Sequence, residues 1–213
     1  MNKVFVRNQK DIEGIIQQIF EDKSIINIGL PGGRSIIPVI KSLIRINFNR
    51  LKSLKFFLVD ERLAVDFNQR YLIKNGFKKL LDIKKINKNQ LFFPKITGNF
   101  KKDLEVYDKI VRNNPLDLVF LGVGEDCHIA SIFPGSEELK SKELTSLITN
   151  SPKMPKERVT LTLRVFEKAK KVLIFFGKEK REALRNYESN YKNKKYPASF
   201  IKGENVIIIT DIK

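Results

Sequence analysis

The chain is poor in cysteine and histidine and has no long apolar run. Its one Cys among 213 residues excludes an intrachain disulfide bond. The longest apolar runs, at 172–176 and 206–209, are far shorter than the ~20 residues that a membrane-spanning helix needs. The amino-terminal stretch MNKVFVRNQKDIEG also lacks the apolar segment of a signal peptide. We therefore expect a protein of the reducing cytoplasm with no membrane partner.

Acidic residues are scarce relative to basic ones. The chain has 24 Asp and Glu against 41 Lys and Arg, a formal net charge of +17. Such an excess raises nucleic acid as a partner, but the basic residues are scattered, and no motif of a nucleic-acid-binding family appears. Heavy use of Lys, Ile, Asn and Phe is what an AT-rich genome favours. We therefore expect no nucleic-acid partner, although the positive field suits a small anionic substrate.

Apolar residues alternate between strand-like runs and helix-like spacing along the whole chain. This alternation, with no internal repeat and no change of composition, predicts an α/β fold: a doubly wound, mostly parallel sheet with helices on both faces. The length suits a single domain over residues 1–213. Strands are predicted at 24–30, 55–59, 118–121, 158–163, 172–176 and 205–210, helices at 11–21, 35–46, 68–81, 103–111 and 178–187, a helical turn at 166–170, and irregular segments at 82–100 and 135–155.

The strongest local signal is the stretch 116–134, LDLVFLGVGEDCHIASIFP. A buried strand runs into a Gly-x-Gly turn and then to His128, the single histidine of the chain. The imidazole is thus expected at the carboxyl end of a central strand, where open α/β sheets bind ligands. A dinucleotide-binding turn would require a small third residue where Cys127 stands. Two interpretations stay open on these residues alone: a histidine that only hydrogen-bonds nearby backbone, and a catalytic imidazole.

A glycine-rich turn follows the strand at 24–30. It reads Pro-Gly32-Gly33-Arg34-Ser35 and leads into a predicted helix. The backbone N–H groups of such a turn point at whatever lies in front of the helix, which suits a phosphate. The turn is not a Walker A loop, because its glycine spacing differs and no Lys-Ser/Thr pair follows. An ordinary strand-to-helix turn is the alternative.

Charged residues stand at two further strand ends. One strand ends on Asp60-Glu61-Arg62, where an acid could orient a base and an arginine could bind an anion; a solvated surface ion pair is the alternative. Lys180 lies in the first turn of the helix predicted at 178–187. A cation there opposes the helix dipole unless an anion is bound nearby. In a lysine-rich chain, Lys180 could equally be one more surface charge.

Taken together, these motifs resemble the 6-phosphogluconolactonase family, part of a larger group with the glucosamine-6-phosphate deaminases and isomerases. The family's Gly-Gly-Ser turn is similar to Gly32-Gly33-Arg34, and its Asp-Glu-Arg signature stands unchanged at 60–62. Its Gly-x-Gly-x-Asp-Gly-His-x-x-Ser-Leu-Phe-Pro stretch appears as GVGEDCHIASIFP. The segments SPKMPKERVTLTL and GKEKREAL resemble two more family elements. The resemblance covers nearly the whole chain.

Two residues depart from the family pattern. Arg34 replaces a serine, which either adds a phosphate contact or reshapes the turn. Cys127 replaces the glycine before the histidine, which costs backbone freedom if that position needs a positive φ. A thiol nucleophile at Cys127 is disfavoured, because adjacent side chains point apart and nothing marks it as activated. Deaminase relatives carry a glutamate where this chain has Phe133, so the resemblance favours the lactonase.

The resemblance implies hydrolysis of 6-phospho-D-glucono-1,5-lactone to 6-phospho-D-gluconate, in the oxidative pentose phosphate pathway, without metal or organic cofactor. His128 would be the general base that activates water, since a histidine has an ordinary pKa of about 6.5, and Asp60 would orient the imidazole or position water. No residue is assigned to the oxyanion. The substrate- and phosphate-binding residues implied are Gly32, Gly33, Arg34, Ser35, Arg62, Arg158 and Lys180, with Asp126 in a supporting role.

Three functions thus remain in competition. The first is the lactonase, acting on a phosphorylated sugar lactone as a monomer or small homo-oligomer. The second is a glucosamine-6-phosphate deaminase or isomerase, which Phe133 opposes. The third is a basic nucleic-acid-binding protein, which the scattered distribution of the basic residues opposes.

Overall fold

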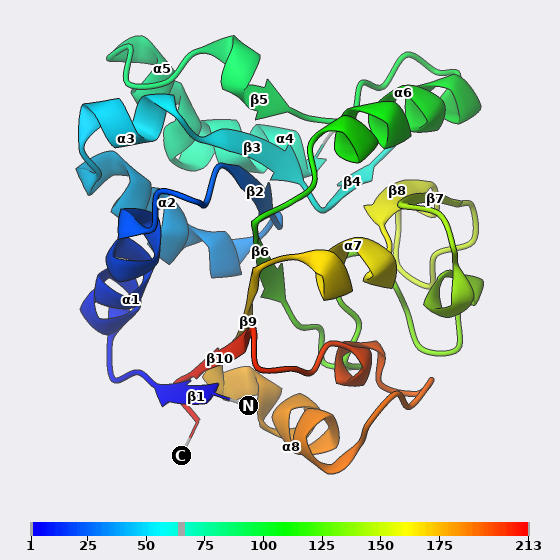
Figure 1. The fold of residues 1–213 in the computed structure, drawn as a ribbon. Helices are drawn as coiled ribbons and strands as arrows, with labels where there is room; N and C mark the ends of the chain where they lie inside the picture. The colour runs from blue at the N-terminus through cyan, green and yellow to red at the C-terminus, as the bar shows by residue number, and fades with distance from the viewer. Residues whose placement is uncertain (1, 64–66, 213) are drawn as a thin grey trace.

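The computed structural model describes residues 2–63 and 67–212, and a seven-stranded parallel sheet forms its centre (Figure 1). The strand order is β1-β10-β9-β6-β2-β3-β5, and each neighbouring pair is parallel. The strands are β1 (Asn2–Phe5), β2 (Asn27–Leu30), β3 (Lys55–Leu58), β5 (Leu91–Phe92), β6 (Leu118–Gly122), β9 (Lys171–Phe176) and β10 (Val206–Thr210). The chain runs outward from β2 to β5 and then returns to place β6 on the other side of β2. The predicted doubly wound parallel sheet is confirmed.

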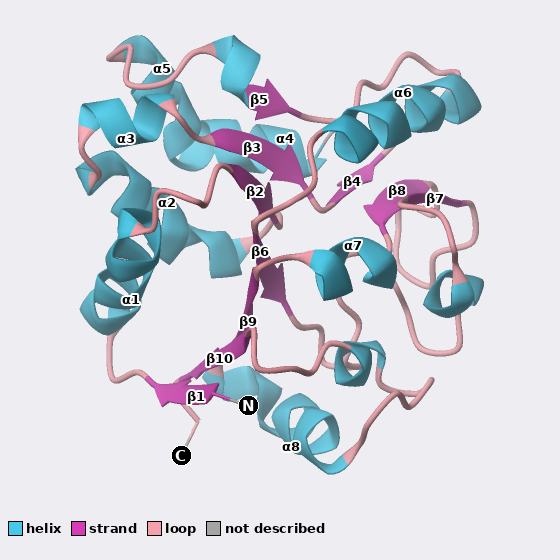
Figure 2. Cartoon of the chain, viewed as in Figure 1, coloured by secondary structure: helices cyan, strands magenta, loops and turns pink. Residues whose placement is uncertain are grey.

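Helices cover both faces of this sheet, as Figure 2 shows. One face carries α1 (Gln9–Glu21), α2 (Ile37–Arg45), α3 (Phe48–Lys52), α4 (Phe67–Leu72) and α5 (Lys78–Asp82), and the other carries α6 (Phe100–Asn113), α7 (Leu163–Lys168) and α8 (Arg181–Ser189). Strand β6 serves both cores, since Leu118 and Phe120 pack with the first set of helices, and Val119 and Leu121 with the second. Its nearly continuous apolar run follows from this double burial. None of the described helices is long and apolar enough to cross a membrane.

A second, antiparallel sheet of three strands stands beside the first. It consists of β4 (Asp60–Arg62), β8 (Arg158–Leu161) and β7 (Thr145–Ile148), in the order β4-β8-β7. The predicted strand at 158–163 is confirmed in a shorter form, whereas the predicted loop at 135–155 is wrong over β7. Because β4 follows β3 after one residue, this small sheet joins the carboxyl edge of the large one and pairs Arg62 with Arg158.

Local signals explain where the other elements begin and break. The side chain of Asn8 accepts the N–H groups of Lys10 and Asp11 and so starts α1 two residues before the predicted helix. The helix predicted at 68–81 is interrupted by a π-helical turn at Ile73–Phe77, where Gly76 has a φ of 156°. Strands β1 and β5 and helix α3 were not predicted. They have four, two and five residues, which is too short for a clear periodicity.

Candidate active site

The predicted site residues follow four adjacent strands at the carboxyl edge of the parallel sheet. In the order β9-β6-β2-β3, these strands lead to Lys180, His128, the Gly32-Gly33 turn and Asp60. The sheet order reverses between β2 and β6, and open α/β sheets bind ligands at such a point. The segment that follows β2 is in contact with the end of β6 at this point. The Oγ of Ser35 lies so close to Gly122 that a Cβ added there would be 2.7 Å from it.

Glycine is required twice in the turn after β2. Gly33 has a φ of 82°, in the region that favours glycine. A Cβ on Gly32 would lie 2.0 Å from the Oδ1 atom of Asn68, so the side chain of Asn68 rests directly on this turn. Arg34 is exposed and begins a 3₁₀ turn, Arg34–Ile36, ahead of α2. The departure at Arg34 therefore leaves the glycine turn intact and adds a cation at its rim.

A cavity of about 530 Å³ lies against this turn. Its lining includes Arg34, Ser35, Gly122 and Lys180, so the glycine turn and the predicted clamp lysine border one space. Lys180 Nζ lies 3.0 Å from Oε1 of Glu125; the lysine side chain is 18% exposed and the glutamate side chain 79%. The hydrogen bond and charge of Lys180 lower the pKa of Glu125. The phosphate-binding role of this group stays a prediction.

Asp60 is buried and held by neutral side chains. Its Oδ2 accepts a hydrogen bond of 2.7 Å from Ser131 Oγ, and its Oδ1 accepts one of 3.0 Å from Asn68 Nδ2. Burial raises the pKa of this carboxyl, although Ser131 and the charges of Arg158, His128 and Arg62 act in the other direction. The hydrogen bonds of Asp60 thus go to Ser131 and Asn68 instead of to the imidazole that it was expected to orient.

Glu61 connects β4 to the first turn of α4. Its carboxylate accepts N–H groups of Arg62 at 2.7 Å, Asn68 at 2.9 Å and Gln69 at 2.7 Å. The side chain is fully buried, and burial raises its pKa to about 6 despite these three donors. The last two donors belong to the first turn of α4, where a carboxylate complements the helix dipole. Glu61 thereby fixes the position of Asn68, a site residue that the sequence did not predict.

Arg62 and Arg158 are cross-strand partners in the small sheet, but their side chains make different contacts. The guanidinium of Arg62 lies 4.1 Å from the ring centroid of Phe67, and its Nε is buried without a hydrogen-bond partner among the described residues. Arg158 is buried, which lowers its pKa, and it donates to main-chain carbonyls of the 153–155 segment. Arg158 therefore anchors a loop, and Arg62 does not line the cavity that Lys180 borders.

His128 sits in a tight loop after β6. Gly124 N–H donates to the carbonyl of His128 at 2.9 Å, and a Cβ on Gly124 would lie 2.0 Å from Nδ1 of the imidazole. Oδ1 of Asp126 contacts Nδ1, and the ring of Phe133 lies 4.7 Å away. Partial burial opposes ionisation of Asp126, but the hydrogen bond and charge of His128, with the charge of Lys153, lower its pKa. With Nδ1 held by a carboxylate, Nε2 is left for a substrate or water.

Cys127 occupies a position that favours glycine. Its φ is 62°, so the backbone cost expected for this departure is present. The thiol is buried, with Sγ 3.3 Å from the carbonyl oxygen of Ala183, and burial together with Asp126 and Glu182 raises its pKa to about 11. A thiol with this pKa stays protonated near neutral pH, which agrees with the expectation that Cys127 is no nucleophile.

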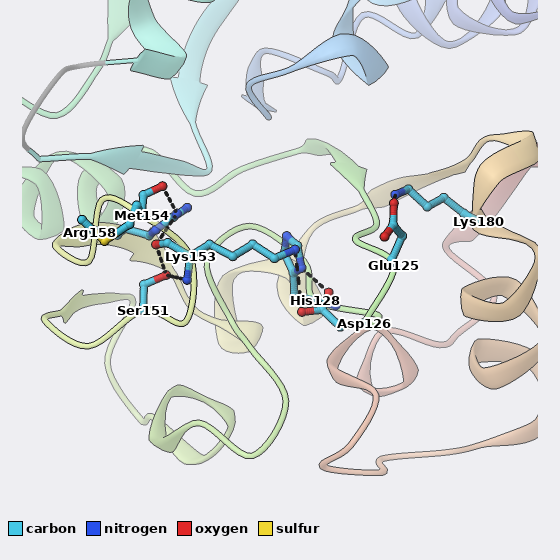
Figure 3. A network of polar contacts seen from close by, with 8 residues as sticks. All are labelled: Glu125, Asp126, His128, Ser151, Lys153, Met154, Arg158 and Lys180. Carbon is cyan, nitrogen blue, oxygen red and sulfur yellow. Dashed lines mark hydrogen bonds and ion pairs between the residues drawn. The ribbon is translucent and has the colours of Figure 1, made fainter.

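A lysine from the segment between β7 and β8 completes the surroundings of His128, as Figure 3 shows. Lys153 extends across to the His128–Asp126 pair, and its Nζ lies 3.8 Å from Oδ2 of Asp126. Lys153 and Ser131 both lie within motifs quoted from the sequence but were given no role there. Asn68 carried no motif signal. These three residues are the ones that sequence reasoning missed.

Comparisons with known proteins show the family of this chain. The model of the family described as "Glucosamine-6-phosphate isomerases/6-phosphogluconolactonase" matches residues 2–209. The chain is 36% identical over 199 residues to a 6-phosphogluconolactonase of Borreliella burgdorferi, covering 88% of this chain and 84% of that protein. It is 31% identical over 193 residues to a glucosamine-6-phosphate deaminase of Malacoplasma penetrans, covering 77% and 78%.

Solved structures point the same way. The crystal structure of 6-phosphogluconolactonase from Thermotoga maritima matches with a TM-score of 0.82 and 26% identity, over 98% of each chain. The resemblance inferred from the motifs is therefore confirmed. The chain belongs to the glucosamine-6-phosphate isomerase/6-phosphogluconolactonase family.

Proposed function

We propose that this protein is a 6-phosphogluconolactonase that hydrolyses 6-phospho-D-glucono-1,5-lactone to 6-phospho-D-gluconate, in the oxidative pentose phosphate pathway. Relatives named 6-phosphogluconolactonase, 36% and 31% identical over 88% and 89% of the chain, support this class of reaction. The observation that carries the proposal is the contact of Asp126 with Nδ1 of His128, which leaves Nε2 free to act as a base beside the ring of Phe133.

In the proposed mechanism, His128 activates a water molecule. Nε2 takes a proton from the water while the water oxygen bonds to the lactone carbonyl carbon and the carbonyl π electrons move to its oxygen. Asp126 accepts a hydrogen bond from Nδ1–H and, staying ionised, stabilises the imidazolium that forms. The tetrahedral intermediate then collapses: the carbonyl re-forms, the bond to the ring oxygen breaks, and that oxygen takes the proton from the imidazolium. The new carboxylic acid ionises in water.

The phosphate is bound by Lys180 and Arg62, with backbone donors from the Gly32-Gly33 turn. Support for Lys180 comes from its place on the cavity that also borders Arg34 and Ser35. A phosphate entering this cavity meets a lysine whose present partner, Glu125, is largely exposed and can swing into solvent. Arg62 lies outside the cavity lining and would have to leave Phe67 to reach the same phosphate.

A deaminase is the second candidate, because relatives with that name match most of the chain. It requires a carboxylate where this chain has Phe133. The ring of Phe133 instead packs at 4.7 Å from the imidazole and 5.6 Å from the guanidinium of Arg158. An apolar ring at this place supplies no proton-transfer group, which favours the lactonase.

An assay of two substrates separates the candidates. The purified protein is mixed in parallel with freshly generated 6-phosphogluconolactone and with glucosamine 6-phosphate, and release of 6-phosphogluconate or ammonia is followed. We expect lactone hydrolysis well above the spontaneous rate and no ammonia. Ammonia release without acceleration of lactone hydrolysis would reject the lactonase and establish the deaminase.

A further inference from the structure

The site as described has a base and a set of phosphate-binding groups, but no group assigned to the negative charge that develops on the lactone carbonyl oxygen. Stabilisation of such an oxyanion is usually a large part of the catalysis of acyl transfer. A cation or a pair of N–H donors near the base, with hydrogen-bonding capacity to spare, would supply it.

Two of the cations around His128 are already engaged. Arg158 donates through Nε to the carbonyl oxygen of Pro155 at 3.1 Å and through Nη2 to that of Lys153 at 2.9 Å. Lys180 pairs with Glu125 at 3.0 Å. The hydrogen bonds of Arg158 anchor the 153–155 segment, and that of Lys180 holds the exposed carboxylate of Glu125.

Lys153 is differently placed. Its Nζ lies 3.8 Å from Oδ2 of Asp126, the oxygen that does not contact the imidazole, and this distance is too long for a hydrogen bond. An ammonium group has three N–H donors, and none of them has a hydrogen-bond partner among the described residues at this site. The side chain is 49% exposed, so its head is open to an arriving ligand.

The main chain beneath Lys153 is firmly held. Its carbonyl accepts from Ser151 Oγ at 2.9 Å and from Arg158 Nη2 at 2.9 Å, and its N–H donates to Ser151 Oγ at 3.2 Å (Figure 3). Arg158 and Ser151 are both buried. Because the backbone of Lys153 is fixed, less entropy is lost when its ammonium group is positioned. The flexible side chain still lets this group follow the reacting atom.

We propose that Lys153 is a catalytic residue that donates a hydrogen bond to the lactone carbonyl oxygen and stabilises the oxyanion. This inference rests on the proposed lactone hydrolysis. As water adds, with its proton passing to Nε2 of His128, the carbonyl π electrons become an oxygen lone pair that faces the ammonium group. When the ring C–O bond breaks, these electrons return to the carbonyl and Lys153 keeps its proton. Between turnovers, the negative charge of Asp126 keeps the ammonium group of Lys153 beside His128.

The test is Lys153→Ala, with Lys156→Ala as the matched control. Lys156 is an exposed lysine of the same loop, so its replacement changes the net charge equally. We expect Lys153→Ala to lower kcat for phosphogluconolactone about 10²- to 10³-fold. KM, and the inhibition constant of inorganic phosphate as a competitive inhibitor, should stay within about twofold of the parent. Lys153→Arg should recover at least about tenfold of the lost rate, because it restores a cationic donor.

Other outcomes overturn the proposal. A higher KM and a weaker inhibition by inorganic phosphate, with kcat little changed, would make Lys153 a phosphate ligand. A kcat within about threefold of the parent would remove it from the mechanism. Loss of activity together with a lowered unfolding midpoint, without recovery in Lys153→Arg, would assign it a structural role. A parent enzyme without lactonase activity would instead reject the proposed function itself.

Discussion

Two pairs of adjacent acids lie at the carboxyl edge of the sheet, and their environments are opposite. Asp60 and Glu61 are 7% and 0% exposed, and burial raises the pKa of each. Asp126 and Glu125 have side chains that are 35% and 79% exposed, and their pKa values are lowered: burial opposes this for Asp126, but hydrogen bonds from His128 and Lys180, with the charges of these residues and of Lys153, outweigh it. Each pair consists of one Asp and one Glu at a strand end. The fold nevertheless favours the protonated form in the buried pair and the ionised form in the exposed pair.

The partners of each pair explain the difference. Asp60 and Glu61 bind hydroxyl, amide and backbone N–H groups, which link β4 to Ser131 and to the first turn of α4. The side chains that contact Asp126 and Glu125 are an imidazole and two lysines, and Asp126 also accepts the backbone N–H of His128. We infer that the buried pair shapes the site and that the exposed pair belongs to its chemistry.

The largest effect is expected at His128, which Asp126 of the exposed pair contacts. His128→Ala should lose about 10²- to 10⁴-fold in kcat for phosphogluconolactone, the range that general base catalysis supplies. The imidazole is partly exposed and its removal leaves the loop backbone bonds in place, so the unfolding midpoint should stay within a few degrees. Steady-state kinetics and thermal unfolding check this. A rate within about threefold of the parent would remove His128 from the mechanism.

Replacing Lys180 should have the second-largest effect, through weaker binding of the substrate phosphate. Lys180→Ala should reduce kcat/KM for the phosphorylated lactone about 10- to 150-fold, the value of a charge-assisted hydrogen bond. Lys178→Ala is the matched control, since it removes an equal charge from an exposed residue two positions away. Equal losses in both variants would indicate general electrostatic steering by a chain of charge +17.

The buried pair should reveal itself in stability instead of rate. Glu61 has its pKa raised to about 6 from 4.5, so its folded state holds a proton more tightly than its unfolded state. The resulting stabilisation is fully present below about 4.5 and is lost as pH rises through about 6. From pH 4.5 to 7, the unfolding free energy of the parent should therefore fall by up to about 2 kcal/mol relative to Glu61→Gln. Urea unfolding of both proteins across this range measures it; a pH-independent difference would contradict the raised pKa.

The sequence predicted the parallel sheet because its central strands are buried on both faces. The apolar runs of β6 and β9 carry that burial in their composition. Strand β5, with two residues, and β7, inside a polar stretch, depend on pairing with distant strands and left no local pattern. The same limit applies to the site. The sequence predicted His128, with Asp126 in a supporting role and Asp60 as the acid that orients the imidazole or positions water, but only the folded loop shows that Asp126 contacts Nδ1 and that Lys153 reaches this acid.

The smallest expected effect has the opposite sign. Glu125 occupies Lys180 when no phosphate is bound, so it competes with the substrate for that cation. Glu125→Gln should therefore lower KM for the phosphorylated lactone about two- to fivefold, the range of an exposed ion pair, with kcat unchanged. A raised KM would show that Glu125 helps to hold Lys180 in place instead of competing for it.

The contrast between the two acid pairs is tested most directly by Asp126→Asn and Asp60→Asn in one assay. Asparagine at 126 removes the negative charge that stabilises the imidazolium, whereas asparagine at 60 can keep hydrogen bonds to Ser131 and Asn68. We expect kcat to fall about 10- to 10³-fold in Asp126→Asn, a part of what general base catalysis supplies, and to stay within about threefold of the parent in Asp60→Asn. The reverse order would contradict this division and return the catalytic role to Asp60.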